Sequence, residues 1–124
     1  MIAIDTSSLI AFLAGEEGED VDAVDRALEL SQAVLPPVVL TEILSAPGLR
    51  PRVARLVRAL PVLETLPGFW ERAADTRSRV LRRRLRARLA DSLIAQFSLD
   101  HGIPLVTRDD DFRHFVRHAG LRLA

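Results

Sequence analysis

The chain contains no cysteine and no lysine, and each absence removes a class of chemistry. Without cysteine, disulfides and thiolate zinc sites are excluded, which fits the reducing cytoplasm. All 17 cationic side chains are Arg, so Schiff-base catalysis and lysine-dependent phosphate loops are excluded as well. The sequence also lacks a run of about 18 apolar residues and a basic segment before an apolar start. We expect a soluble cytoplasmic protein without a membrane span or a signal peptide.

The length and the apolar content are enough for one packed core. With 124 residues, of which 48% are hydrophobic, residues 1–124 are expected to form a single domain. The charges sum to zero but are unevenly spread, because residues 1–49 hold nine acids and one Arg whereas residues 50–88 hold twelve Arg and three acids. This asymmetry indicates that the middle of the chain meets a polyanion or an acidic partner. The alternative is a helix face that is simply exposed to water.

Short apolar runs alternate with helical patterns along the chain. Strands are expected at residues 1–5, 33–35 and 104–107, with 62–66 as a further strand or an extended connector and 121–124 as a possible edge strand. Apolar spacing with Pro and Gly boundaries predicts helices at residues 6–13, 21–28, 37–45, 51–60, 69–81, 91–101 and 112–120. Strands that alternate with helices form a mostly parallel sheet through right-handed crossovers. The expected fold class is α/β, with a central sheet flanked by helices.

Four acidic residues are predicted to gather at the carboxyl ends of the strands, where α/β folds bind their ligands. Asp5 ends the first strand, and Glu42 lies about a turn and a half into the helix after the second. Asp91 opens the helix that leads back to the strand at 104–107, and Asp109 follows that strand. Each has an ordinary alternative as a helix cap or a solvent-facing side chain. Four carboxylates that meet repel one another unless a cation neutralises them, and an all-oxygen cluster selects Mg²⁺ or Mn²⁺.

Three of the acids in this part of the chain are consecutive. Asp109, Asp110 and Asp111 stand where a strand should end, and neighbouring like charges repel by about 1 kcal/mol at 4 Å in water. Asp109 is predicted to face the metal. Asp111 either supports the site or caps the following helix, and Asp110 should point elsewhere, to solvent or to a cap.

Three stretches in order carry a resemblance to a known family: IDTSSLIAFL at 4–13, VVLTEILS at 38–45 and LADSLIAQFSLDHGIPLVTRDDDF at 89–112. The last is the most specific, with an Asp that opens a helix, then Gly, apolar residues, Thr and an Asp-rich turn that ends in Phe. Together they resemble PIN-domain ribonucleases, and more closely the VapC-type toxins of toxin–antitoxin pairs. The segment from 49 to 89 matches this pattern poorly.

The resemblance implies an acidic catalytic quartet, formed by Asp5, Glu42, Asp91 and Asp109. Asp5, Asp91 and Asp109 are then the expected metal ligands. Ser7 and Thr107 match polar positions that help to hold such a site, and Asp111 matches a second acid before the Phe.

The family further implies a Mg²⁺-dependent endoribonuclease that uses metal-activated water and leaves a 5′-phosphate. It also implies a homodimer and a cognate antitoxin that covers the site. An RNA or partner surface is predicted at five arginines, because Arg pairs with phosphate or carboxylate through two hydrogen bonds. These are Arg82, Arg83, Arg84, Arg86 and Arg88.

Other functional classes fit the residues less well. A phosphate-accepting receiver domain needs a Lys, and a haloacid-dehalogenase-type phosphatase needs an Asp where Ser7 stands. A Ser-His-Asp hydrolase could use His101, His114 or His118, but no GxSxG motif is present. The remaining alternative is a non-catalytic Arg-rich module that binds RNA or protein, and it leaves the four acids without a role.

Overall fold

The computed structural model describes all of residues 1–124, and its centre is a three-stranded parallel sheet in the order β2-β1-β3. The strands are β1 (Ile2–Ile4), β2 (Ala33–Val34) and β3 (Leu105–Val106). Almost every strand residue is buried, which explains why each strand is a continuous apolar run rather than an alternating one. The expected α/β fold with a parallel central sheet is confirmed.

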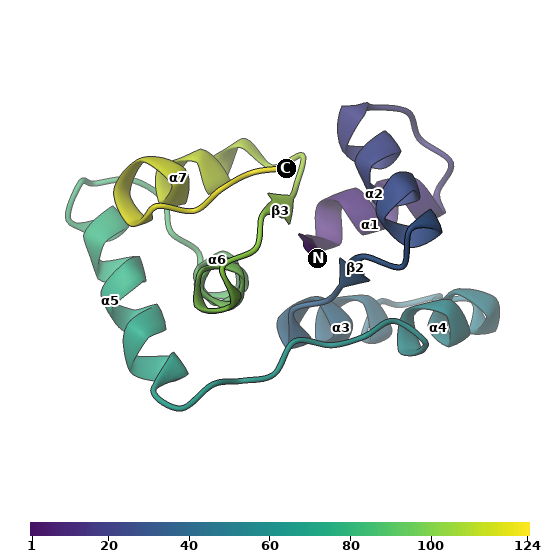
Figure 1. Ribbon diagram of the computed structural model, residues 1–124, viewed down its shortest axis with the longest axis horizontal. Helices are drawn as coiled ribbons and strands as arrows, with labels where there is room; N and C mark the ends of the chain where they lie inside the picture. Colours follow the sequence, from purple (N-terminus) through teal and green to yellow (C-terminus); the bar gives the residue numbers. More distant parts are fainter.

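Seven α-helices and one short 3₁₀ helix surround the sheet. They are α1 (Thr6–Leu13), α2 (Glu19–Glu29), α3 (Pro37–Leu44), α4 (Pro51–Arg58), α5 (Phe69–Leu81), α6 (Leu89–His101), η1 (Asp110–Phe112) and α7 (Arg113–Ala119). Figure 1 shows α1 and α2 on one side of the strands and α3 and α6 on the other. Right-handed crossovers that leave β1 and β2 in opposite directions require this arrangement. None of the helices is both long enough and apolar enough to cross a membrane.

The two segments left open as strands, 62–66 and 121–124, each form a single bridge. Val62 forms one parallel bridge with Leu35, and Leu123 forms one with Leu105. The segment at 62–66 is therefore an extended connector. Prolines stand on both sides of it, at 61 and 67, and a proline has no amide hydrogen to continue a ladder.

Helix α6 is the central helix of the molecule and carries apolar residues to two sides. Ile94 and Ala95 belong to the main core beside the sheet, whereas Phe97 packs into a smaller cluster with Phe69 of α5. The rings of Phe69 and Phe97 stack with centroids 4.1 Å apart. Packing from both sides holds α6 in place, and with it the first turn of the helix at the carboxyl edge of the sheet.

Candidate metal centre

Asp5 lies between β1 and α1 and is 4% exposed. Its Oδ2 accepts hydrogen bonds from Ser7 Oγ at 2.6 Å and from Thr107 Oγ1 at 2.8 Å. Burial raises the pKa of Asp5 above its usual range, and the two hydroxyl groups oppose this rise. Asp5 stands at the N-cap position of α1, as the helix-cap alternative has it, but its side chain makes no cap hydrogen bond to the helix. Ser7 and Thr107 instead hold the carboxylate at the junction of two neighbouring strands.

Asp91 lies inside the first turn of α6, because the helix begins at Leu89, two residues earlier than predicted. The N-cap is Arg88, so the cap alternative is wrong for Asp91. Its Oδ2 is buried and has no hydrogen-bond partner. Burial, then the negative charges of Asp5 and Asp109, raises the pKa of Asp91 to about 6. Buried oxygens without a partner are rare in folded proteins, and this one calls for a positive ligand.

The three consecutive acids have three different surroundings. Asp109 Oδ1 accepts the amide hydrogen of Asp111 at 2.9 Å and so caps η1. Of the two alternatives for Asp111, capping is not seen, because Asp109 caps η1 and α7 has no side-chain cap. Asp110 points to solvent, with 88% of its side chain exposed, and lies 3.6 Å from Arg113 Nε.

The carboxylate of Asp111 turns back toward the acidic edge. Asp91, Asp109 and Asp111 each offer one oxygen, and these three oxygens lie within 4.8 Å of one another. The three expected ligands included Asp5 in place of Asp111. Asp5 lies near enough for its charge to raise the pKa of Asp91, yet the compact group contains Asp111. The signal in the sequence that could have placed Asp111 in this group was its spacing of two residues from Asp109. The turn of η1 brings the carboxylates of these two residues close together.

Glu42 completes the acidic edge from α3 and is exposed. Its Oε1 accepts a hydrogen bond from Thr6 Oγ1 at 2.7 Å, a contact that sequence reasoning missed. The charge of Glu42 also contributes to the raised pKa of Asp91. The four acids predicted to converge thus come from four separate segments and meet at one edge of the sheet.

These residues fit a hard divalent cation. Every candidate donor is a carboxylate oxygen, which is the donor type that Mg²⁺ and Mn²⁺ prefer. The nearest compensating cations are Arg86, with Nη1 3.8 Å from Asp111 Oδ2, and Arg88, whose charge lowers the pKa of Asp91. Neither bonds the buried oxygen of Asp91. The cluster therefore keeps an excess of negative charge and one free buried donor.

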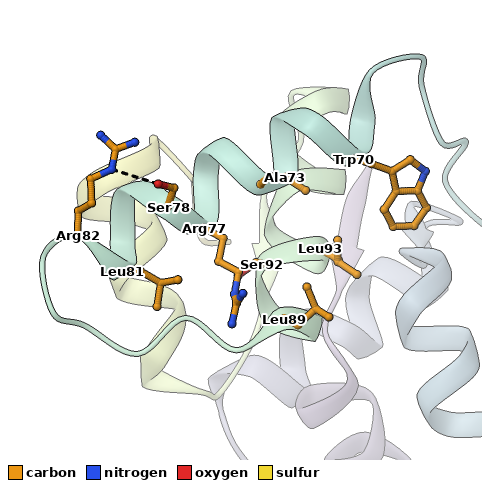
Figure 2. A pocket seen from close by; sticks show the side chains of 10 residues that line it. Trp70, Ala73, Arg77, Ser78, Leu81, Arg82, Leu89, Ser92 and Leu93 are labelled. Carbon is orange, nitrogen blue, oxygen red and sulfur yellow. Dashed lines mark hydrogen bonds between the residues drawn. The ribbon is translucent and has the colours of Figure 1, made fainter.

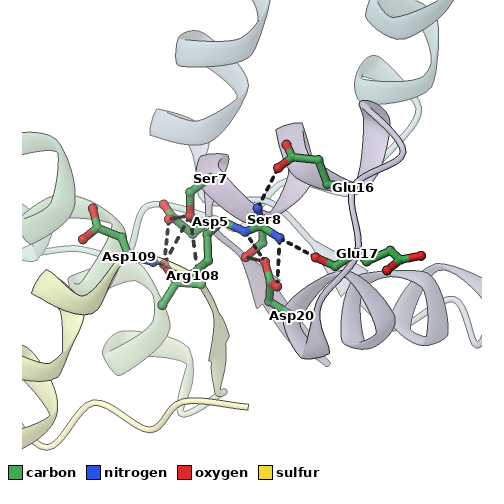
Figure 3. A network of polar contacts seen from close by, with 9 residues as sticks. Asp5, Ser7, Ser8, Glu16, Glu17, Asp20, Arg108 and Asp109 are labelled. Atoms are coloured by element: carbon green, nitrogen blue, oxygen red, sulfur yellow. Dashed lines mark hydrogen bonds and ion pairs between the residues drawn. The ribbon is translucent and has the colours of Figure 1, made fainter.

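Arg108 connects the turn that carries Thr107 and Asp109 to the loop before α2 (Figure 3). Its Nε donates to Asp20 Oδ2 at 2.9 Å, and its Nη1 donates to Glu16 Oε1 at 3.1 Å. The hydrogen bond from Arg108 is the main cause that lowers the pKa of Asp20 to about 2. Sequence reasoning missed this network, for which the only signal was an acidic loop at 16–22 and one Arg beside the candidate site.

Asp20 also reaches helix α1, because its Oδ2 accepts a hydrogen bond from the buried Ser8 at 2.7 Å. Figure 3 shows the Asp109 carboxylate turned away from the Arg108 guanidinium. Arg108 thus pairs with Asp20 and Glu16, and not with the carboxylates of the acidic edge.

Two hollows adjoin the acidic residues. One, of about 450 Å³, is lined by Thr107, Arg108 and Asp109 among others. The second, of about 570 Å³, runs between α5 and α6 and is lined mostly by apolar residues that include Trp70 and Leu93 (Figure 2). Ser92, the residue after Asp91, lines this groove, which places the groove beside the first turn of α6.

The five arginines predicted to form a surface are all exposed: Arg82, Arg83, Arg84, Arg86 and Arg88. They lie on the connection between α5 and α6, which ends at the acidic edge. Their contact with RNA or a partner remains a prediction.

Comparison with known proteins finds one matching family and several solved structures of similar fold. The PIN domain model matches residues 2–117. One similar structure is VapBC2 from Rickettsia felis, bound to a DNA fragment from its own promoter. It is 18% identical with a TM-score of 0.72, covering 100% of this chain and 98% of that chain. FitAcB from Neisseria gonorrhoeae is 20% identical with a TM-score of 0.72, covering 99% of this chain and 96% of that chain.

A third structure is VapBC-5 from Mycobacterium tuberculosis, a member of the VapBC family of toxin-antitoxin systems. It is 21% identical with a TM-score of 0.70, covering 98% of this chain and 94% of that chain. No curated protein sequence matches the chain significantly. At these identities the three structures share the fold of this chain.

Proposed function

Because the chain belongs to the PIN-domain family, whose model spans residues 2–117, we propose that it is a metal-dependent endoribonuclease. Two observations at Asp91 carry this proposal together: its buried Oδ2 has no partner, and one of its carboxylate oxygens lies within 4.8 Å of oxygens of Asp109 and Asp111. A binding module without catalysis leaves this arrangement unexplained, because carboxylates that face a ligand repel phosphate. The whole chain, residues 1–124, is proposed to act as one nuclease domain.

Asp91, Asp109 and Asp111 are proposed to hold Mg²⁺ or Mn²⁺, with Asp5 close behind them. When bound, such an ion polarises a phosphate and lowers the pKa of a coordinated water. Ser7 and Thr107 keep the Asp5 carboxylate in one orientation through their hydroxyl groups. The cap bond from the Asp111 amide does the same for Asp109.

Glu42 has a different place in the proposal, because it is exposed at the rim. Thr6 Oγ1 holds its Oε1 at 2.7 Å, and the free carboxylate oxygen is available to accept a proton from water that approaches the substrate. Hydrolysis of the phosphodiester would then leave a 5′-phosphate, as the family resemblance predicts.

We further propose that the protein is the toxin of a VapBC-type pair. Structural neighbours named VapBC and FitAcB support this proposal. We propose a cognate antitoxin and a second copy of the chain as its protein partners, RNA as its substrate, and the cytoplasm as the place where it acts.

The purified protein should cleave RNA only when Mg²⁺ or Mn²⁺ is present, and Asp91→Asn should abolish cleavage because it replaces the charged carboxylate with a neutral amide, a much weaker metal ligand. The measurement is the size distribution of a labelled RNA after incubation with each ion and with EDTA. Asp110→Asn is the matched control, since it removes the same charge at a solvent-exposed position. Cleavage that persists in EDTA, or an Asp91→Asn variant with wild-type activity, would contradict the proposal.

A further inference from the structure

A third hollow, of about 340 Å³, is lined only by basic side chains. Its four lining residues are Arg79, Arg82, Arg83 and His118, contributed by the end of α5, the turn after it and α7. None of the three arginines takes part in an ion pair of the structure. Arg82 Nε donates a hydrogen bond to Ser78 Oγ at 3.1 Å, and the remaining N–H groups of Arg82 have no acceptor within the chain.

The packed core holds these cations together against their repulsion. Helices α5 and α7 pack on each other, with Val80 and Phe115 fully buried between the elements of the main core. His118 lies close enough to Arg83 for the two to interact: burial lowers the pKa of His118 most, and the charge of Arg83 lowers it further. A rigid group of like charges with unused donors is a complementary surface for an anion.

The turn after α5 is built in a conformation that residues other than glycine seldom adopt. Arg84 has φ 58°, in the left-handed region. The amides of Arg83 and Arg84 close this turn on the carbonyls of Val80 and Leu81, at 3.0 and 2.9 Å. The turn keeps Arg83 beside α7 and sends the chain back toward the acidic edge.

We propose that this hollow binds a backbone phosphate of the RNA strand whose scissile bond lies at the acidic edge. This inference rests on the proposed nuclease function. The guanidinium groups of Arg79, Arg82 and Arg83 supply paired N–H donors that match phosphate oxygens. Figure 2 shows Arg82 at the end of α5 with its guanidinium pointing away from Leu81 and the apolar groove.

A row of cations joins the hollow to the candidate metal centre, and this row favours RNA over an acidic protein segment. Arg83 and Arg86 are three residues apart, so their Cα atoms are at most about 11 Å apart. Arg86 reaches Asp111 at 3.8 Å, and Arg88 stands at the start of α6 beside Asp91. Phosphates repeated along one strand can follow such a row. The arginines of the row offset the repulsion that the acidic edge exerts on these phosphates.

The test is the salt dependence of RNA binding by the full-length protein in EDTA, where the proposed cleavage is off. A short single-stranded RNA with a fluorescent 5′ label is titrated at several KCl concentrations. The double variant Arg82→Gln/Arg83→Gln should bind several-fold more weakly, with the slope of log K against log salt reduced by about 0.7 for each phosphate that the variant no longer neutralises. Arg79→Gln should show the same change at smaller scale and keeps the test open if the double variant fails to fold.

The control is Arg52→Gln/Arg55→Gln, which removes the same charge from two exposed arginines of α4 and should leave the slope unchanged. Wild-type protein that binds RNA while both test variants keep its slope would overturn the phosphate site and leave the nuclease proposal standing. Loss of affinity for polyglutamate with RNA binding intact would assign the hollow to an acidic protein partner and also overturn it. Wild-type protein that neither binds nor cleaves RNA would overturn the nuclease proposal itself.

Discussion

Asp91 is the residue in which burial and function oppose each other most directly. Its buried oxygen has no partner, and its pKa is raised to about 6 by burial and by the neighbouring acids. Without a cation, the ionised carboxylate destabilises the folded protein. Removing its charge should therefore relieve repulsion while it removes metal binding.

A pH-dependent stability difference follows for Asp91→Asn in EDTA. The folded pKa of about 6 exceeds the reference value of 3.8, so the folded wild type binds more protons than the unfolded chain between these values. Its stability falls as the pH rises through that window, and the variant lacks this fall. Between pH 4 and pH 7, the free energy of unfolding of the variant should rise relative to that of the wild type by on the order of 1 kcal/mol. This is less than the full pKa shift would give, because water screens the half-buried carboxylate.

Urea denaturation of both proteins at the two pH values measures this difference. Asp110→Asn serves as the control, since its exposed side chain should show no such gain. A variant that loses stability relative to wild type at the higher pH would show that Asp91 has a partner in the folded state.

Replacing each of the three consecutive acids with Asn should change the affinity of the protein for Mn²⁺ to a different extent. Asp109→Asn and Asp111→Asn should each weaken Mn²⁺ binding by roughly tenfold or more, a typical cost at metal sites, because each removes a charged donor from the group within 4.8 Å. Asn also caps helices well, so the melting temperature of Asp109→Asn should change little. Asp110→Asn should leave both quantities near the wild-type values. Calorimetric Mn²⁺ titration and thermal melts measure them, and a dominant loss in Asp110→Asn would mean that the turn is assigned wrongly.

At the scale of elements, Arg108 determines how the β3 turn is attached to the rest of the fold. One guanidinium contacts Asp20 and Glu16 from the loop and helix that follow α1, while its backbone lies between Thr107 and Asp109. The network therefore couples the position of two candidate site residues to a loop about 90 positions earlier in the chain.

Replacing Arg108 with Gln should weaken Mn²⁺ binding as well as lower the melting temperature, because the turn loses its attachment to Asp20. Both quantities are measured as for the acidic variants. The control is Arg117→Gln, an exposed arginine of α7 without an ion pair. If Arg108→Gln lowers the melting temperature with Mn²⁺ affinity unchanged, its role is structural only.

The elements themselves were largely predictable, whereas the contacts among their ends were not. Proline and glycine mark most helix boundaries, so α3, α4 and α5 begin at the expected residues. The segments 62–66 and 121–124 were ambiguous because a strand depends on how far its partner continues, and each pairs at one residue only. The turn of Asp111 toward Asp91 and the pairing of Arg108 with Asp20 depend on tertiary packing, which local patterns do not encode.

At the scale of the whole molecule, the uneven charge distribution becomes an acidic edge and a basic connection between α5 and α6. Part of the acidic excess of the first 49 residues is neutralised by Arg108, while Asp5 and Glu42 join the acidic edge. The arginines of the middle segment lie on the connection that runs back to this edge. The PIN-domain resemblance seen in three motifs is confirmed at the level of the family and the fold. The middle segment matched that pattern poorly, and it supplies three of the four residues that line the unpaired basic hollow.

The pairing of β1 with β3 has a consequence for the time at which the acidic edge can form. Thr107 bonds Asp5 across 102 positions of the chain, and β1 is completed by a strand near the other terminus. Synthesis proceeds at about 5–20 residues per second, so a nascent chain carries Asp5 for several seconds before Thr107 and Asp109 exist. A chain that stops at Gly102 should accordingly bind no Mn²⁺. The acidic edge therefore assembles late, only after β3 and the turn that follows it have been synthesised and have paired with β1.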